Sequence, residues 1–267
     1  MTQTYVFDNA WQQERSRLDA LETIWDAWTF QQLEAVSVSD GWRCAEVGAG
    51  GGSVAAWLCR RVGPAGRVVA TDLDTRLLDG VEEPNLEVRR HDITAEDLEP
   101  GAYDLVHARL LLEHLPAHEQ ALQRMLAALK PGGWLVVEEF DHGTFMPDPD
   151  CNEEQRAAWD AWLAAFGCLA EGRGLDLAYG SRLFGLLRRL GLDAVSAEGY
   201  TVAERGGSES RALLLLSVLK LRDALTATGA IDDEGIERLI SLLRDPAFSW
   251  TSQLMVSARG RRPASNL

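Results

Sequence analysis

The fold is decided by residues 43–62, which read RCAEVGAGGGSVAAWLCRRV. The first five residues, with Cys44, Ala45 and Val47, predict a short core strand, and the stretch from Ser53 to Val62 predicts a helix. Between them lies a cluster of glycines, where the backbone can turn sharply and approach a ligand because no Cβ stands in the way. An open parallel sheet binds ligands beyond the carboxyl ends of its strands, which is where this loop is predicted to lie.

The rest of the chain repeats this alternation of apolar runs and helical patterns, which is typical of a parallel sheet covered by helices. Further strands are predicted at residues 67–71, 86–90, 103–107, 134–140, near 193–203 and roughly 248–258. Further helices are predicted at residues 11–37, about 117–129, 152–171, 182–190, 208–228 and 232–244. Lys130-Pro131-Gly132-Gly133 is predicted to form a tight turn, because proline and paired glycines cannot continue a helix.

We therefore expect an α/β fold with a Rossmann-like, seven-stranded, mostly parallel sheet and helices on both faces. Residues 1–40 are predicted to form a helical N-terminal extension or cap. Residues 41–267 are predicted to form the main domain, with a helical cap insertion around 146–175.

Composition narrows the function. The chain has 26 basic and 41 acidic residues, so its formal charge is −15, which disfavours a nucleic-acid partner. Its longest apolar run, Ala212 to Leu216, is far shorter than the roughly 18 residues of a membrane helix. The N-terminus lacks a signal-peptide pattern, so we expect a cytoplasmic protein without membrane partners.

The four cysteines lack metal-ligand spacing, and no metal is expected. The apolar helical stretch at 208–221 is compatible both with core packing and with a homodimer interface.

Asp72 follows the predicted strand at residues 67–71. An acidic side chain there can accept both hydroxyls of a ribose and would repel a 2′-phosphate, which disfavours NADP. The dinucleotide fingerprint G-x-G-x-x-G would require glycine at position 53, where this chain has Ser53. No phosphate-loop lysine follows the glycines, so we do not expect a nucleoside triphosphate site.

Five segments in order resemble the motifs of class I S-adenosylmethionine-dependent methyltransferases of the small-molecule, secondary-metabolite type. These segments are Glu46–Gly52, Asp72–Leu73, His91–Ile93, Tyr103–Arg109 and Leu129–Leu135. The resemblance implies S-adenosylmethionine as cofactor and S-adenosylhomocysteine as product. It also implies that the glycine loop wraps the methionine and ribose, that Asp72 binds the ribose hydroxyls, and that Asp92 holds the adenine amino group. The cofactor-binding residues expected from it are Glu46, Gly48, Ala49, Gly50, Asp72, Leu73, Asp92, Ile93 and His107.

Methyl transfer to a hydroxyl is helped by a general base. The candidate catalytic residues are His142 and Asp141, which follow the predicted strand at 134–140, and His107, which ends the strand at 103–107. An Asp-His pair after that strand resembles the base position of some small-molecule O-methyltransferases, and a plain loop role is the alternative. For His107, contact with cofactor or substrate and a hydrogen bond at the edge of the core are both open.

Aromatic residues are predicted to close the site from two helical segments. They favour an apolar or aromatic acceptor of modest size over a protein or nucleic acid. For each tryptophan, packing in the core is the alternative. Arg109 is predicted to hold an acidic group of substrate or cofactor, or else to pair with Glu113 one helical turn later. The candidate substrate-binding residues are Tyr5, Trp11, Arg109, Trp159 and Trp162.

The predicted function is therefore methyl transfer from S-adenosylmethionine to an O or N atom of a small molecule by in-line displacement. The acceptor atom, including carbon, stays open. One alternative is a protein that binds the same cofactor but catalyses another reaction, such as a cyclisation. The other is a non-enzymatic binding partner, which would have no need of the glycine loop together with Asp72 and Asp92.

Overall fold

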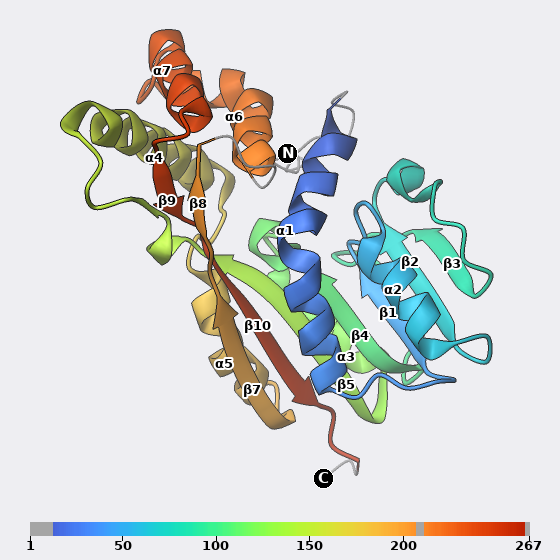
Figure 1. The fold of residues 1–267 in the computed structure, drawn as a ribbon. Helices are drawn as coiled ribbons and strands as arrows, with labels where there is room; N and C mark the ends of the chain where they lie inside the picture. The colour runs from blue at the N-terminus through green and yellow to red at the C-terminus, as the bar shows by residue number, and fades with distance from the viewer. Residues whose placement is uncertain (1–12, 207–210, 265–267) are drawn as a thin grey trace. The chain divides into compact units, whose positions relative to one another are not determined.

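The computed structural model describes residues 13–206 and 211–264, which form two compact units (Figure 1). The sheet unit comprises Trp25–Asp141, Ala178–Tyr200 and Met255–Leu267. The helical unit comprises Met1–Ile24, His142–Leu177 and Thr201–Leu254. The division falls within helix α1 (Glu14–Ala35), so the first half of that helix is assigned to one unit and the second half to the other.

The sheet unit contains a seven-stranded sheet in the order β3-β2-β1-β4-β5-β10-β7, which confirms the predicted fold. Neighbouring strands from β3 to β5 are parallel, and β10 pairs with β7 in the antiparallel sense. The strands are β1 (Arg43–Val47), β2 (Arg67–Asp72), β3 (Leu86–Arg90), β4 (Tyr103–Arg109), β5 (Leu129–Asp141), β7 (Asp193–Tyr200) and β10 (Leu254–Arg261). Because β1 to β5 run parallel, their carboxyl ends share one edge of the sheet (Figure 1).

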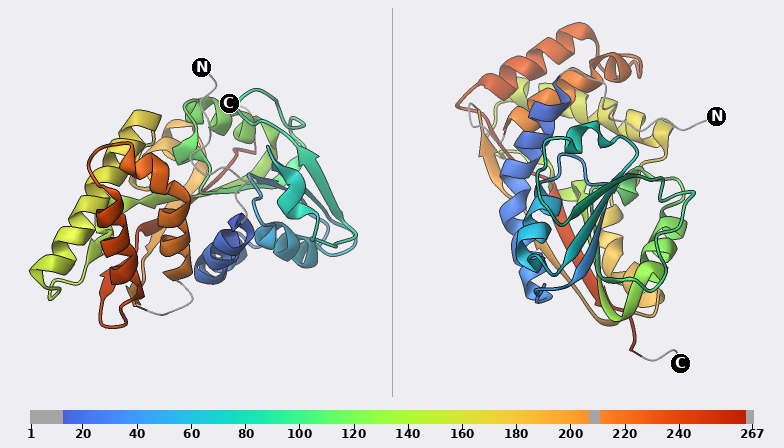
Figure 2. Two further views of the ribbon diagram at one scale, coloured as in Figure 1. Left: turned by 90° about the horizontal axis from the view of Figure 1, so that it is seen from above. Right: turned by 90° about the vertical axis from the view of Figure 1, so that its right-hand side faces the viewer.

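Helices cover both faces of this sheet, as predicted (Figure 2). The second half of α1 and α2 (Ser53–Val62) lie on one face, and α3 (His118–Ala128) and α5 (Tyr179–Arg189) lie on the other. On α2, Val54, Leu58 and Val62 are spaced four residues apart and are all buried in the core. This spacing places them on one side of the helix, so burial of a single apolar stripe docks α2 onto the sheet.

The predicted turn at residues 130–133 lies inside strand β5 rather than before it. Leu129 pairs with Tyr103 and Trp134 pairs with Leu105, so the residues between them bulge out of the ladder. Gly132 has a φ of +82°, and its N–H donates to the carbonyl of Arg262 at 2.9 Å. The proline and glycines therefore interrupt the strand without ending it, because Arg262 satisfies the backbone of the bulge.

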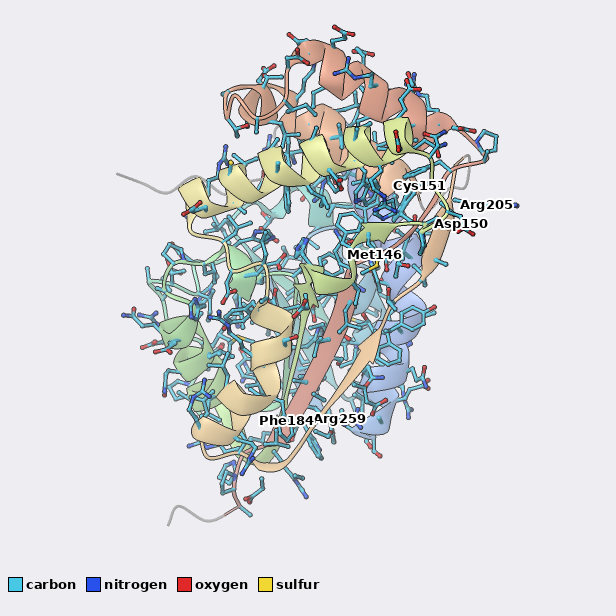
Figure 3. The ribbon with its side chains drawn as sticks, turned by 90° about the vertical axis from the view of Figure 1, so that its left-hand side faces the viewer. Met146, Asp150, Cys151, Phe184, Arg205 and Arg259 are labelled. Carbon is cyan, nitrogen blue, oxygen red and sulfur yellow. The ribbon has the colours of Figure 1, made fainter. Side chains whose placement is uncertain are left out.

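The predicted strands near 193–203 and 248–258 each split in two. Their shorter halves, β8 (Ala203–Arg205) and β9 (Ser249–Thr251), join β6 (Met146–Pro147) in a second sheet of order β6-β9-β8. Met146 and Arg205 mark its outer strands in Figure 3. The breaks meet at the buried Ser252, whose backbone N–H donates to the Val202 carbonyl and whose hydroxyl accepts the Val202 N–H.

The helical unit surrounds an aromatic core. Its main helices are α4 (Glu153–Arg173), α6 (Arg211–Thr226) and α7 (Asp233–Arg244). The core includes Trp159, Phe248 and Trp250, with Val218 and Leu225 from α6. A capping box between Asn152 and Gln155 begins α4, at 2.8 and 3.0 Å. In the described parts of the chain, no helix combines the length and the apolar character needed to span a membrane.

Candidate functional site

The glycine-rich loop leaves β1 in a conformation that requires glycine. Gly48, Gly50 and Gly52 have φ values of +73°, +53° and +88°, in the left-handed region that side chains rarely adopt. The N–H groups of Gly48 and Ala49 both donate to the carbonyl of Thr71 on β2, at 2.8 and 3.0 Å. These bonds hold the loop at the carboxyl end of β1. Because glycine has no Cβ, the backbone of the loop is open to close approach by a ligand.

Asp72, at the end of β2, connects this loop to the next strand. Its Oδ2 accepts the N–H of Gly50 at 3.0 Å, and its Oδ1 accepts the N–H of Asp74 at 3.1 Å. Burial raises the pKa of Asp72, and these backbone N–H groups oppose the rise. Each carboxylate oxygen has a second lone pair, so the side chain can still accept hydrogen bonds from a ligand. Leu73 beside it is 51% exposed, which leaves its apolar surface available.

The segment after β3 lies against the same edge. The N–H of His91 donates to the carbonyl of Asp72 at 2.9 Å. Asp92 accepts the hydroxyl and the N–H of Thr94, at 2.6 and 2.9 Å, and the hydroxyl bond lowers its pKa. Ile93 is buried. The structure thus brings this segment next to the end of β2.

His107 is fully buried between two carboxylates. It pairs in register with Glu46 on β1, and its Nδ1 lies 2.7 Å from Glu46 Oε2. Its Nε2 lies 3.4 Å from Oε2 of Glu138 on β5. Burial alone would lower the pKa of His107, but the two carboxylates outweigh it and raise the pKa to about 9. The imidazole is therefore charged at neutral pH, and both of its nitrogens are engaged.

The second half of α1 extends this buried polar chain. The Thr29 hydroxyl donates to Glu138 Oε2 at 2.6 Å and accepts a bond from Arg109 at 2.9 Å. Arg109 also pairs with Asp26 at 3.0 Å, and Asp26 accepts the Ser53 hydroxyl at 3.0 Å. The ion partner of Arg109 is thus Asp26 rather than Glu113. Sequence reasoning missed Asp26, Thr29 and Glu138, although two successive glutamates ending an apolar strand were a signal.

Glu139 faces a different set of partners from Glu138. It is fully buried and accepts backbone N–H groups from Leu111, Leu112 and Glu113 at 3.1, 2.6 and 3.4 Å. Burial raises the pKa of Glu139, and the three N–H groups oppose the rise. These bonds hold the segment that follows β4, where the short helix η2 (Leu112–His114) begins.

The candidate bases occupy adjacent positions that are assigned to different units. Asp141 ends β5, and its carboxylate accepts the hydroxyl of Ser181 on α5. His142 begins the short helix η3 (His142–Thr144), and its N–H donates to the carbonyl of Leu177 at 2.9 Å. The half-buried His142 ring lies 5.6 Å from the ring of Phe166, centroid to centroid.

Of the two predicted aromatic walls, the helix at 152–171 belongs to the helical unit. Trp159 and Trp162 are buried, and each ring packs edge-on against Phe145 at 5.1 Å between centroids. In this cluster, Phe166 and His142 are only half buried. Tyr5 and Trp11 lie outside the described residues, so their predicted role stays a prediction.

Comparisons with known proteins agree with this architecture. Residues 31–197 match the model of a methyltransferase domain family. The ubiquinone/menaquinone biosynthesis C-methyltransferase UbiE of Pseudomonas entomophila is 31% identical over 158 residues, which cover 56% of this chain and 58% of that protein. The chain spans about half the length of the curated relatives it matches.

Two solved structures show the same fold. Phosphoethanolamine N-methyltransferase 2 of Haemonchus contortus, solved with phosphomonomethylethanolamine and S-adenosylhomocysteine, has a TM-score of 0.52 at 17% identity, over 84% of this chain and 49% of that one. The [4+2]-cyclase SpnF has a TM-score of 0.52 at 16% identity, over 90% and 82%. At such identities the likeness concerns fold and not activity. The family model covers more than half of the chain, and with the motifs of the sheet edge it shows that this chain belongs to the class I S-adenosylmethionine-dependent methyltransferases.

Proposed function

We propose that the protein transfers the methyl group of S-adenosylmethionine to a small-molecule acceptor. The observation that carries this proposal is the edge formed by the left-handed turn at Gly48–Gly50 and the Asp72 carboxylate. The Gly50 N–H donates to Asp72 at 3.0 Å, so this hydrogen bond fixes the carboxylate next to the loop. A loop that presents bare backbone beside a ribose-binding acid suits a nucleoside-containing cofactor.

The residues at this edge fit the cofactor. The glycine loop would hold the methionine and ribose, and Asp72 would accept the ribose hydroxyls. The exposed Leu73 offers apolar surface for the adenine ring, and Asp92 offers a carboxylate for its amino group. When bound, S-adenosylmethionine supplies an activated methyl group that an acceptor nucleophile takes by in-line displacement.

We assign His107 a positioning role instead of proton transfer. Its two nitrogens face Glu46 and Glu138, and its raised pKa of about 9 keeps it protonated at neutral pH. A group that already carries its proton, with both nitrogens occupied, does not accept another from an acceptor hydroxyl. It instead fixes the orientation of the two carboxylates that flank it.

His142 is our first candidate for a general base, and Asp141 is the second. Asp141 already accepts the Ser181 hydroxyl, which occupies part of its carboxylate. His142 lies beside Phe166 and Phe145, which supports an apolar or aromatic acceptor. For an O-acceptor, an imidazole is the side chain that most often serves as general base.

Two steps of one experiment test the proposal. The purified chain is first titrated calorimetrically with S-adenosylmethionine and S-adenosylhomocysteine, and we expect micromolar dissociation constants for both. It is then incubated with methyl-labelled cofactor and a panel of phenols, aromatic amines and hydroquinones, which offer O, N and C acceptors. Label transfer with matching release of S-adenosylhomocysteine supports methyl transfer. Conversion of an added compound without that release would instead favour a reaction such as cyclisation, and failure of both ligands to bind would overturn the proposal.

A further inference from the structure

Leu111 packs against the first glycine of the cofactor loop. A Cβ placed on Gly48 would lie 3.1 Å from Leu111 Cδ1 and 3.2 Å from Cδ2. The Leu111 side chain therefore lies directly over the position that a Cβ on Gly48 would occupy, and it limits how far Gly48 can move in that direction. On its other side, the Gly48 N–H is bonded to Thr71 of β2 at 2.8 Å. The loop is therefore held between β2 and the side chain of Leu111.

Leu111 owes its position to a buried carboxylate. Glu139 Oε1 accepts the N–H groups of Leu111 and Leu112, at 3.1 and 2.6 Å. The preceding residue, Leu110, has a φ of +53°, which is an unfavourable conformation for a leucine and needs support from its surroundings. Its N–H donates to the carbonyl of Glu138 at 2.8 Å, so β5 holds this turn at two successive residues.

We infer that Glu139 is a positioning residue for the cofactor loop and that it acts through Leu111. The inference rests on the proposed function. The carboxylate fixes the backbone at residues 111–112, the backbone fixes the Leu111 side chain, and that side chain limits where Gly48 can lie. Without the carboxylate, the three N–H groups of residues 111–113 lose their acceptor, and the turn would rearrange to find another. The glycine loop would then lose the surface that sets its position.

Substitutions separate this role from a general role in folding. Glu139→Gln keeps one amide oxygen as acceptor for Leu111 and Leu112, and Glu139→Met removes both acceptors at similar volume. Leu111→Ala removes the contact with Gly48 and leaves the carboxylate intact. Leu115→Ala is the matched control. Leu115 is a half-buried leucine of the same segment, and the atoms nearest the Cβ position of Gly48 all belong to Leu111 instead.

The dissociation constant of S-adenosylhomocysteine is measured by calorimetry for each variant, with the melting temperature measured in parallel. We expect Glu139→Met and Leu111→Ala each to weaken binding about tenfold, and Glu139→Gln and Leu115→Ala to stay within about threefold of the original chain. The double variant Leu111→Ala/Glu139→Met should bind no more weakly than the weaker single variant, because both changes remove the same contact. A loss of stability alone would not produce this non-additivity in binding.

The outcomes distinguish the two proposals. If Leu111→Ala and Leu115→Ala both bind S-adenosylhomocysteine as tightly as the original chain does, the role of Leu111 is overturned. This holds even if Glu139→Met fails to fold. Multiplied losses in the double variant overturn the claim that Glu139 acts through Leu111. If the original chain does not bind S-adenosylhomocysteine at all, the proposed function fails and this inference fails with it.

Discussion

The two units differ in where they bury charged side chains. Glu14, Arg17 and Glu204 are buried in the helical unit, whereas the sheet unit concentrates buried charges at one edge of its sheet. In the sheet unit, Glu46, His107, Glu138 and Glu139 are buried at the carboxyl ends of β1, β4 and β5. In the helical unit, Trp159, Phe248 and Trp250 fill an apolar core. An aromatic core is explained by the hydrophobic effect alone. Buried charges are costly unless they are paired, so their concentration at one edge indicates where this fold has been shaped for binding.

The largest expected effect comes from removing the charge at the centre of the sheet edge. His107→Leu leaves Glu46 and Glu138 buried without their shared cation. We expect the free energy of unfolding at pH 7 to fall by about 3–5 kcal/mol, as measured by urea denaturation. His118→Leu, a change at a half-buried histidine on α3, is the control. A loss below about 1 kcal/mol would show that the two carboxylates do not depend on His107.

The same histidine predicts how stability depends on pH. Its pKa rises from an ordinary value of 6.5 to about 9 in the folded chain, so folding favours the protonated form. This contribution is fully present below pH 6.5 and is lost as the pH rises through 9. The free energy of unfolding should therefore decrease by about 3 kcal/mol over that interval. Urea denaturation across the pH range checks this, and a His107→Leu chain that shows the same decrease would contradict it.

A third change tests whether cofactor binding depends on the sheet edge and turnover on the candidate base His142. His142→Gln removes the candidate base and conserves much of the side-chain volume. With an O-acceptor identified by the panel, we expect kcat to fall about 100-fold while the dissociation constant of S-adenosylhomocysteine stays unchanged. Stopped-flow or single-turnover assays with labelled cofactor measure the first quantity and calorimetry the second. If His142→Gln also weakened the binding of S-adenosylhomocysteine, the proposal that His142 acts in turnover and not in cofactor binding would be wrong.

The smallest effect is expected at the start of α4. Asn152→Ala removes the capping box and should lower the free energy of unfolding by about 1 kcal/mol, as followed by urea denaturation. The affinity for S-adenosylhomocysteine should not change, since the cofactor residues lie in the sheet unit. An affinity loss as large as that of Leu111→Ala would mean that binding depends on the helical unit as well.

Local patterns predicted the sheet edge well. The bounds of β1, α2 and β3 coincide with their predicted ranges, because glycines and prolines mark the ends of short apolar runs. The motif residues could be placed because Asp72 ends β2 and Asp92 lies two residues after β3.

Long-range pairing was not accessible in the same way. Thr29 and Glu138 form a hydrogen bond across 109 positions of the chain, and nothing local to either residue indicates the other. The strands β6, β8 and β9 have only two or three residues each, too few to show an alternating pattern. The tryptophans at 159 and 162 suggested a wall of the site, whereas their spacing equally fits the buried face of α4 on which they lie.

The central claim is that the glycine loop and Asp72 hold the cofactor, and one pair of titrations tests it most directly. Asp72→Ala and Asp74→Ala are compared by calorimetry with S-adenosylhomocysteine. Asp72 accepts the Gly50 N–H at 3.0 Å, whereas the Asp74 carboxylate pairs with the neighbouring Arg76. We predict that Asp72→Ala weakens binding about 100-fold or more and that Asp74→Ala stays within about threefold. Equal affinities in the two variants would contradict the account.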